Sequence, residues 1–137
     1  MLTNQIILLV EDDPNDVFLI QRAFEKAGLD SILKVVRDGE QAIDYLSGKD
    51  QYANRSRFPV PFLLLLDLKM PGRDGFEVLE WLRQNPDAAP AQTVILSGSE
   101  LPSDIRRARE MGAADYFSKP PSVIRLRQLL SQVPVRR

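Results

Sequence analysis

The sequence has 137 residues, of which 44% are hydrophobic, and its 18 Lys and Arg residues nearly balance 19 Asp and Glu residues. This length suits one domain with a sizeable core, and a net charge of −1 gives no general attraction to nucleic acid or to anionic membranes. Cysteine and histidine are absent, which excludes thiolate and imidazole catalysis and nearly every transition-metal site. The remaining chemistry is that of carboxylates, hydroxyls and ammonium groups.

The N-terminus has no basic stretch followed by an apolar core and a cleavage site. No apolar run approaches the length of a membrane span, which is about 18 residues or more. We therefore expect a cytoplasmic protein. We also expect residues 1–137 to form a single domain without an output domain, because the chain has no room for a second one.

The first half of the chain alternates between predicted strands and helices. Residues 6–10 form a continuous apolar run, which is typical of a strand that is covered on both faces. Asp13 and Pro14 then indicate the start of a helix that we expect to end at Gly28. The alternation continues with a strand at residues 31–37 and a short helix at 39–46.

A long polar segment separates this half from the next. Residues 47–61 show no periodicity and end with two prolines, which predicts a surface loop. The apolar run at 62–66 predicts a third strand. Apolar residues at helical or strand spacing then predict helices around 76–82, 105–111 and 123–133, and strands at 93–96 and 114–118.

This alternation predicts an α/β fold in which helices cover both faces of a five-stranded, doubly wound parallel sheet. In such open sheets, ligands bind outside the carboxyl ends of the strands, near the point where the strand order reverses. The residues that follow each predicted strand are therefore the candidates for a functional site.

Polar side chains follow four of the five predicted strands. Glu11 and Asp12 follow the first, Asp67 the third, Ser97 the fourth and Lys119 the fifth. Taken singly, each has an ordinary structural interpretation: Asp12 as a helix cap, Ser97 as a turn residue, Lys119 as an exposed lysine. Together they place three acids, a hydroxyl and an ammonium at one edge of the sheet, which predicts a functional site.

Clustered carboxylates indicate a cation. Two like charges about 4 Å apart repel by about 4 kcal/mol at an effective dielectric near 20, and Lys119 supplies only one positive charge. Mg²⁺ suits such a site because it accepts a few carboxylates and completes its shell with water and phosphate oxygens. Asp67 could then act as a nucleophile toward phosphorus, while Lys119 and Ser97 hold the other phosphoryl oxygens.

Four motifs carry a family resemblance, and they occur in order along the whole chain. They are ILLVEDD, LLLLDLKMPGRDG, VILSGS and DYFSKP. In these motifs the chain resembles the receiver domain of a bacterial two-component response regulator. The resemblance implies a flavodoxin-like (CheY-like) three-layer sandwich with strand order 2-1-3-4-5.

The same resemblance implies roles for the phosphorylation site. Asp67 would be the phosphoacceptor, and Glu11 and Asp12 would be the acidic pair for Mg²⁺, with Asp12 favoured for direct coordination. Asp67 and the main-chain carbonyl of Lys69 would complete the protein ligands. Asp13 lies one position past the acidic pair, and we expect it to lead into the first helix.

The resemblance also implies a switch. Ser97 would be the switch hydroxyl, Lys119 the phosphate-binding ammonium and Tyr116 the switch aromatic. A half-buried strand aromatic with its hydroxyl in water is an equally good interpretation of Tyr116. The Lys119–Pro120 bond resembles one that is often cis in the family.

The implied function is that of a switch controlled by phosphorylation. A partner histidine kinase would donate the phosphoryl group, because this chain has no histidine. The change would alter a protein-binding surface formed by the fourth helix, the fifth strand and the fifth helix, for a downstream target or a homodimer. Five arginines on these helices are interpreted as a solvated face: Arg106, Arg107, Arg109, Arg125 and Arg127.

The long loop with YANRSR and the absence of an output domain resemble stand-alone regulators paired with phytochrome-type sensor kinases. Beyond slow self-dephosphorylation, no enzymatic activity is expected. Three other interpretations fit the sequence less well. A phosphohydrolase of the haloacid dehalogenase type would require Asp at the position of Lys69, and an FMN binder would require a phosphate-binding loop in place of EDDPND. A docking receiver that is not phosphorylated would not require all the site residues that are present.

Overall fold

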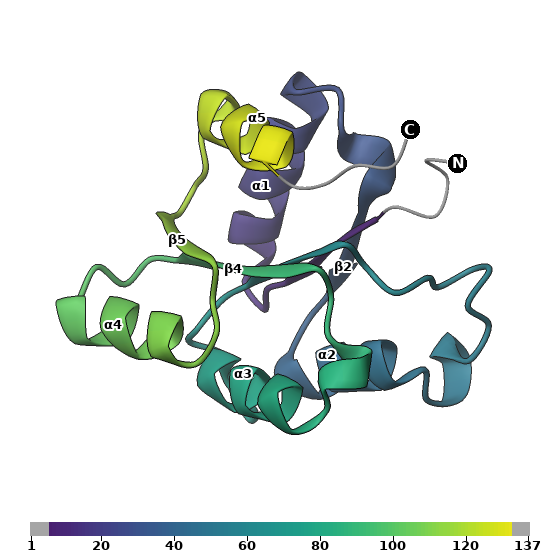
Figure 1. Ribbon diagram of the computed structural model, residues 1–137. Helices are drawn as coiled ribbons and strands as arrows, with labels where there is room; N and C mark the ends of the chain where they lie inside the picture. The colour runs from purple at the N-terminus through teal and green to yellow at the C-terminus, as the bar shows by residue number, and fades with distance from the viewer. Residues whose placement is uncertain (1–5, 133–137) are drawn as a thin grey trace.

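The five strands form one parallel sheet (Figure 1). The structure is a computed structural model, and it describes residues 6–132. The strands are β1 (Ile7–Val10), β2 (Leu33–Val36), β3 (Leu63–Leu66), β4 (Gln92–Ser97) and β5 (Asp115–Ser118). The helices are α1 (Pro14–Lys26), α2 (Gly39–Ser47), α3 (Gly75–Gln84), α4 (Pro102–Glu110) and α5 (Val123–Gln132). The sheet order is β2-β1-β3-β4-β5 and every pairing is parallel, so the predicted fold and strand order are confirmed.

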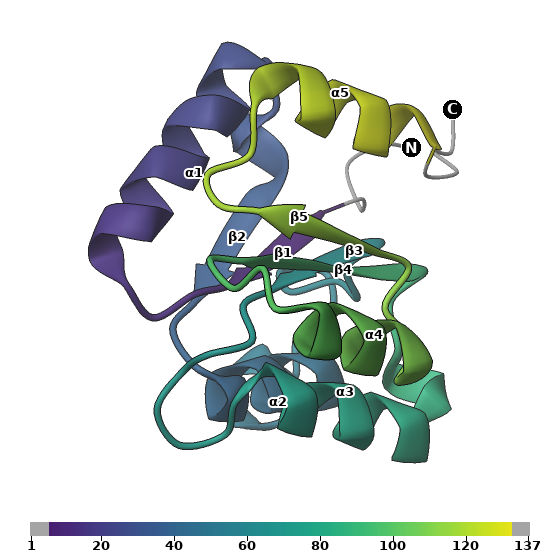
Figure 2. The ribbon, with the colours of Figure 1, turned by 90° about the vertical axis from the view of Figure 1, so that its left-hand side faces the viewer.

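Helices lie on both faces of the sheet. Figures 1 and 2 show α1 and α5 on one face and α2, α3 and α4 on the other. Because side chains alternate along a strand, Ile7 and Leu9 pack toward α1 and α5, whereas Leu8 and Val10 pack with the α2 to α4 layer. The strand runs are continuously apolar because both faces are covered, which keeps the strands that carry the site dry and rigid.

Acidic caps start α1 and α3, the helices that follow β1 and β3. The Asp13 side chain accepts a hydrogen bond from the Asn15 amide at 2.8 Å, so Asp13 leads into α1 as expected. Asp74 and Glu77 form a reciprocal capping box at the start of α3. Each cap ends a strand-to-helix turn abruptly and thereby fixes the path of the loop at the carboxyl edge of the sheet.

One predicted segment differs from the structure, and the end of another is not tested by it. Residues Asp30–Ile32 form a 3-10 turn, so the second strand begins only at Leu33. The predicted last helix reached Val133, which lies outside the described residues. Among residues 6–132, no helix has the length and apolar character needed to cross a membrane.

The segment at 47–61 is an ordered cap on α2. It contains a 3-10 turn at Asp50–Tyr52, and the Arg55 guanidinium donates hydrogen bonds of 2.8 and 2.7 Å to the carbonyls of Tyr45 and Leu46. These carbonyls lie at the end of α2, where helices lack internal partners. The rings of Tyr45, Tyr52 and Phe58 pack against one another.

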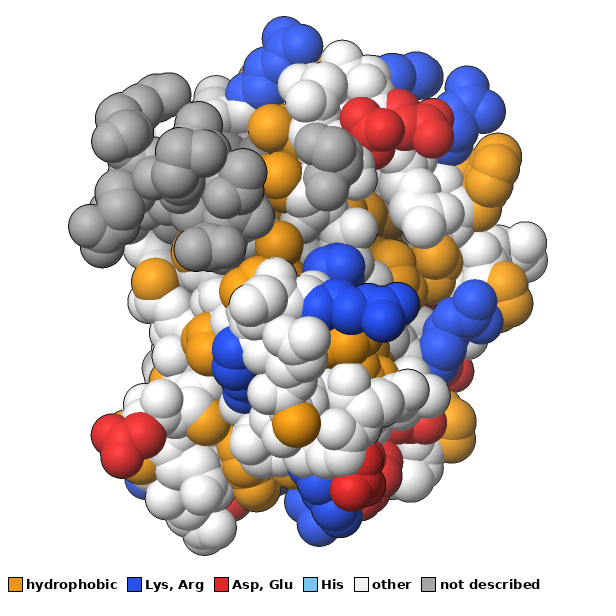
Figure 3. All heavy atoms as spheres, turned by 90° about the vertical axis from the view of Figure 1, so that its right-hand side faces the viewer, with side chains coloured by type: hydrophobic (Ala, Val, Ile, Leu, Met, Phe, Trp, Pro, Cys, Tyr) orange, Lys and Arg blue, Asp and Glu red, His pale blue; other side chains and the backbone are white. Residues whose placement is uncertain are grey.

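Basic side chains surround this cap on the outside. Lys34 and Arg57 lie over the Phe58 ring, at 5.7 and 5.5 Å from its centre. Figure 3 views the molecule from the side on which the loop lies, and basic and hydrophobic side chains lie next to one another over that face. The polar loop is therefore a packed part of the domain.

The five arginines of α4 and α5 are exposed, as the interpretation from sequence expects, and three of them also contact a neighbouring side chain. Arg107 lies over the Phe76 ring at 4.0 Å and Arg125 over the Phe117 ring at 4.3 Å. Arg109 pairs with Asp115 at 3.4 Å. The sequence pattern could not show these contacts, because an exposed guanidinium can lie over an aromatic ring of a neighbouring element while its other face stays in water.

Candidate functional site

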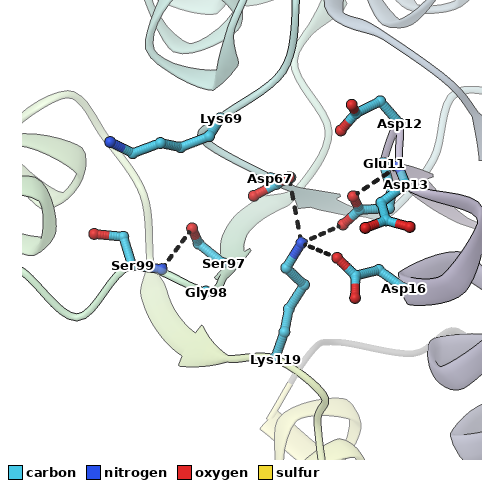
Figure 4. A pocket seen from close by; sticks show the side chains of 10 residues that line it. All are labelled: Glu11, Asp12, Asp13, Asp16, Asp67, Lys69, Ser97, Gly98, Ser99 and Lys119. Atoms are coloured by element: carbon cyan, nitrogen blue, oxygen red, sulfur yellow. Dashed lines mark hydrogen bonds and ion pairs between the residues drawn. The ribbon is translucent and has the colours of Figure 1, made fainter.

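The carboxyl ends of β1, β3, β4 and β5 meet around a hollow of about 530 Å³. All five side chains predicted from the strand ends line it: Glu11, Asp12, Asp67, Ser97 and Lys119. Asp13, Asp16, Lys69, Gly98 and Ser99 complete the lining (Figure 4). The structure thus brings together residues that are more than 100 positions apart in the sequence.

Three acids form the floor and one wall of this pocket. Carboxylate oxygens of Glu11, Asp12 and Asp67 lie within 4.8 Å of one another. Glu11 is 1% exposed and Asp67 4% exposed, so two of these carboxylates are shielded from water. This set consists only of hard oxygen donors, which fits a divalent cation of the Mg²⁺ type.

The backbone of Asp67 is held tightly against α3. The amide of Gly75, the first residue of α3, donates a 2.9 Å hydrogen bond to the Leu68 carbonyl. A Cβ atom at position 75 would overlap the Asp67 carbonyl oxygen and the Leu68 Cα. Only glycine permits this close approach, which places the carboxylate of Asp67 at the rim of a buried strand.

Lys119 faces the acids from the end of β5. Its Nζ donates to Asp16 at 2.7 Å, to Glu11 at 2.8 Å and to Asp67 at 3.3 Å. An ammonium group has three N–H donors, so these three carboxylates satisfy it fully. Figure 4 shows the Lys119 side chain reaching into the acidic group, whereas the Lys69 side chain extends away from it.

Burial changes the proton affinities of the three groups in direct contact. Burial raises the pKa of Glu11 to about 7, and the Asp67 charge adds to the rise while the Lys119 hydrogen bond opposes it. The pKa of Asp67 is also raised, mainly by burial and against the pull of Lys119. Burial lowers the pKa of Lys119, but the hydrogen bonds that its ammonium donates to Asp16 and Glu11 outweigh this effect, and the net shift of the pKa is upward. The acids are therefore only partly compensated by one ammonium.

The fourth strand contributes a hydroxyl and a hydrogen-bonded turn. Ser97 is 1% exposed, and its Oγ accepts a 3.2 Å hydrogen bond from the Ser99 amide. The Ser99 hydroxyl donates to Asp104 of α4 at 2.7 Å, and its carbonyl accepts from the Tyr116 hydroxyl at 2.8 Å. Ser99 thus joins the pocket to α4 and to β5.

These contacts include the Tyr116 side chain, whose role as a switch aromatic stays a prediction. Its ring is half-buried and packs against the core on the α2 to α4 face, and its hydroxyl has a protein acceptor. The peptide bond between Lys119 and Pro120 is cis, as the resemblance implies. The roles of individual residues in phosphorylation stay predictions, as does coordination by the Lys69 carbonyl.

Comparison with known proteins shows the family to which the chain belongs. The family described as the response regulator receiver domain matches residues 7–131. The chain belongs to this family. Response regulator Rcp1 from Synechocystis is 36% identical over 115 residues, which cover 84% of this chain and 76% of Rcp1. The recognition made from the four motifs is thereby confirmed.

Solved structures of receiver proteins superpose on nearly the whole chain. The Mn²⁺-bound form of Rcp1 is 31% identical with a TM-score of 0.78, over 97% of this chain and 99% of the other. Bacteriophytochrome response regulator RtBRR is 34% identical with a TM-score of 0.81, over 97% and 80%. The phosphorylated cyanobacterial phytochrome response regulator RcpA is 33% identical with a TM-score of 0.79, over 97% and 99%. The receiver is thus similar to regulators that are named for phytochromes.

Sequence reasoning missed three residues of the receiver pocket and its surroundings: Asp16, Ser99 and Asp104. Asp16 lies in the first turn of α1, where an acid has an ordinary role with the helix dipole. Its place one turn after the acidic pair, on the helix that leaves the pocket, is the signal that could have found it.

Proposed function

We propose that this receiver domain accepts a phosphoryl group on Asp67 from a phosphohistidine of a partner sensor kinase. The observation that carries the proposal is the setting of the Asp67 carboxylate. It ends a buried strand, lies within 4.8 Å of Glu11 and Asp12 oxygens and is 3.3 Å from the Lys119 ammonium. A nucleophile, a cation site and a charge-compensating donor are the parts that phosphoryl transfer requires.

The residues present fit Mg²⁺ as the divalent cation. Glu11, Asp12 and Asp67, with the main-chain carbonyl of Lys69, would hold it, and the existence of an Mn²⁺-bound form of the relative Rcp1 supports binding of a divalent ion. When bound, Mg²⁺ would neutralise charge on the carboxylates and on the phosphoryl oxygens.

The transfer itself uses residues of this chain. An Asp67 carboxylate oxygen attacks phosphorus, the new O–P bond forms, and the P–N bond to the donor imidazole breaks, with the electron pair staying on nitrogen. Lys119 donates hydrogen bonds to the phosphoryl oxygens. Ser97 turns its hydroxyl toward the new group, which releases the Ser99 amide and alters the surface made of α4, β5 and α5.

The histidine comes from another protein, since this chain has none. Similarity to regulators named for phytochromes supports a phytochrome-type kinase as the donor in the cytoplasm. We propose that the altered surface binds a downstream protein or a second copy of this chain. The domain acts as a switch, with no turnover beyond slow loss of its own phosphoryl group.

The test is labelling by a small phosphodonor such as phosphoramidate with Mg²⁺, followed by intact mass. The native protein is expected to gain one phosphoryl group and Asp67→Asn none, while the exposed Asp87→Asn behaves as native. Labelling of Asp67→Asn at the native rate would refute the assignment. Sustained release of phosphate from small phosphate esters would favour a phosphohydrolase, and absence of labelling in the native protein would favour a docking receiver.

A further inference from the structure

The Lys119 ammonium has one partner outside the candidate cation group. Glu11 and Asp67 belong to that group, whereas Asp16 does not. Yet the shortest of the three contacts of Lys119 is the one to Asp16, at 2.7 Å against 3.3 Å to Asp67. The ammonium is thus drawn toward α1 and away from the phosphoacceptor.

We propose that Asp16 is a positioning residue that holds the Lys119 ammonium while Asp67 and Glu11 are used by the divalent cation and the phosphoryl group. This inference rests on the proposed function. A carboxylate that coordinates a cation has fewer lone pairs for an ammonium, so Lys119 loses partners when the pocket fills. Asp16 keeps one donor of Lys119 in place and leaves the others directed into the pocket.

The place of Asp16 suits this role. It lies on a rigid helix whose start is fixed by the Asp13 cap and by Pro14. Its side chain is 29% exposed, against 1% for Glu11 and 12% for Lys119, so it lies at the edge of the pocket and reaches the ammonium from outside the buried group. Without Asp16, the ammonium would pair with Glu11 and Asp67 alone and compete with the cation for both carboxylates.

Titration of the metal-free protein with Mg²⁺ by calorimetry tests this competition. Asp16→Asn removes the charge at nearly constant volume, and we expect the Mg²⁺ Kd to rise about three- to tenfold. Asp13→Asn is the matched control, because Asp13 lines the same pocket without contacting Lys119 and Asn also caps helices. Its expected effect is about twofold or less. Equal weakening by both variants would show that charge alone acts, and would overturn the proposal.

A double-mutant cycle asks whether Asp16 acts through Lys119. In a Lys119→Met background, Asp16→Asn is expected to change the Mg²⁺ Kd by less than about twofold. A full effect in that background would overturn the proposal. Asp16→Glu retains the carboxylate and is expected to restore most of the native affinity, whereas failure to restore it, with the variant folded, would count against the positioning role.

The ammonium itself can be observed without metal or phosphodonor. The ¹⁵N signal of the Lys119 ammonium is expected to be visible in the native protein, because three acceptors slow its proton exchange, and to broaden in Asp16→Asn. An unchanged signal and unchanged Mg²⁺ affinity would reduce Asp16 to an acid that stabilises the start of α1. If the native protein takes no phosphoryl group, the proposed function fails, but this signal still decides whether Asp16 holds Lys119.

Discussion

The hydroxyl of Tyr116 donates a 2.8 Å hydrogen bond to the main-chain carbonyl of Ser99. This contact links β5 to the turn that follows β4. In the same turn, Ser99 is also hydrogen-bonded to Ser97 at the pocket and to Asp104 on α4. A rearrangement of Ser97 therefore reaches two elements of the proposed binding surface through one residue.

Tyr116→Phe removes this hydrogen bond and keeps the ring. We expect labelling of Asp67 by a phosphodonor to proceed within about twofold of the native rate, because the hydroxyl does not line the pocket. The free energy of unfolding should fall by about 1 kcal/mol. Amide hydrogen exchange should show a smaller difference in α4 between the free and phosphorylated forms than in the native protein. An unaltered exchange difference would remove Tyr116 from the switch.

Ser97→Ala separates labelling from the response to it. The Ser99 amide loses its acceptor and the phosphoryl group loses a hydroxyl donor, so the exchange difference in α4 should be largely abolished. Labelling should fall only a few-fold, because Asp67, Lys119 and the cation supply most of the charge compensation. Ser118→Ala, an exposed serine on β5, is the control. Equal loss of labelling and response would contradict a switch role.

Cation binding should depend on pH through Glu11. Its pKa is raised to about 7, so below pH 7 a proton occupies a carboxylate that the cation needs, and above pH 7 it does not. The Mg²⁺ Kd should therefore increase as pH falls, by up to about tenfold per unit between pH 7 and 5, and level off above 7.5. Calorimetry across this range measures it. Glu11→Gln should flatten the dependence, and a native profile that is already flat would contradict the prediction.

Arg55→Ala should destabilise the domain. Its guanidinium donates to three carbonyls, those of Tyr45, Leu46 and Phe58, and Arg55→Ala removes all three bonds, although the Gly48 amide still bonds the Tyr45 carbonyl. We expect the free energy of unfolding in urea to fall by about 2 kcal/mol. Arg57→Ala, in the same loop, removes one exposed contact with Phe58 and should cost less than about 1 kcal/mol. Similar losses for the two variants would mean that Arg55 does not cap α2.

The sequence predicts the sheet and the residues that meet at the site, but it does not predict the detailed geometry of the site. Continuous apolar runs such as Leu63–Leu66 identify strands buried on both faces, and parallel strands bring their carboxyl ends to one edge. The meeting of Glu11, Asp67 and Lys119 follows from that rule alone. Their distances and pKa shifts do not, because they depend on side-chain directions and burial.

The contacts that escaped prediction involve side chains with ordinary local roles. Asp16 and Lys119 are 103 positions apart, and no periodicity in the sequence relates them. In the sequence, Arg55 is one polar residue in a polar loop. In the structure, its guanidinium holds that loop in place by donating hydrogen bonds to carbonyls at the end of α2. Such cases are decided by tertiary geometry, where an unsatisfied backbone group and a long side chain happen to meet.

Because Gly75 has no side chain, the start of α3 packs directly against the backbone of Asp67 and Leu68, and this side of the pocket is fixed. The chain at Asp67 cannot shift toward α3, because backbone atoms already fill the space there. On the opposite side, a Cβ at Gly98 would meet no atom within 4 Å, so there is open space beside this residue of the turn after β4. If Asp67 accepts a phosphoryl group as proposed, we expect the added group to displace that turn and to leave β3 in place. The difference in free volume between the two sides of the pocket would then set the direction in which the signal travels.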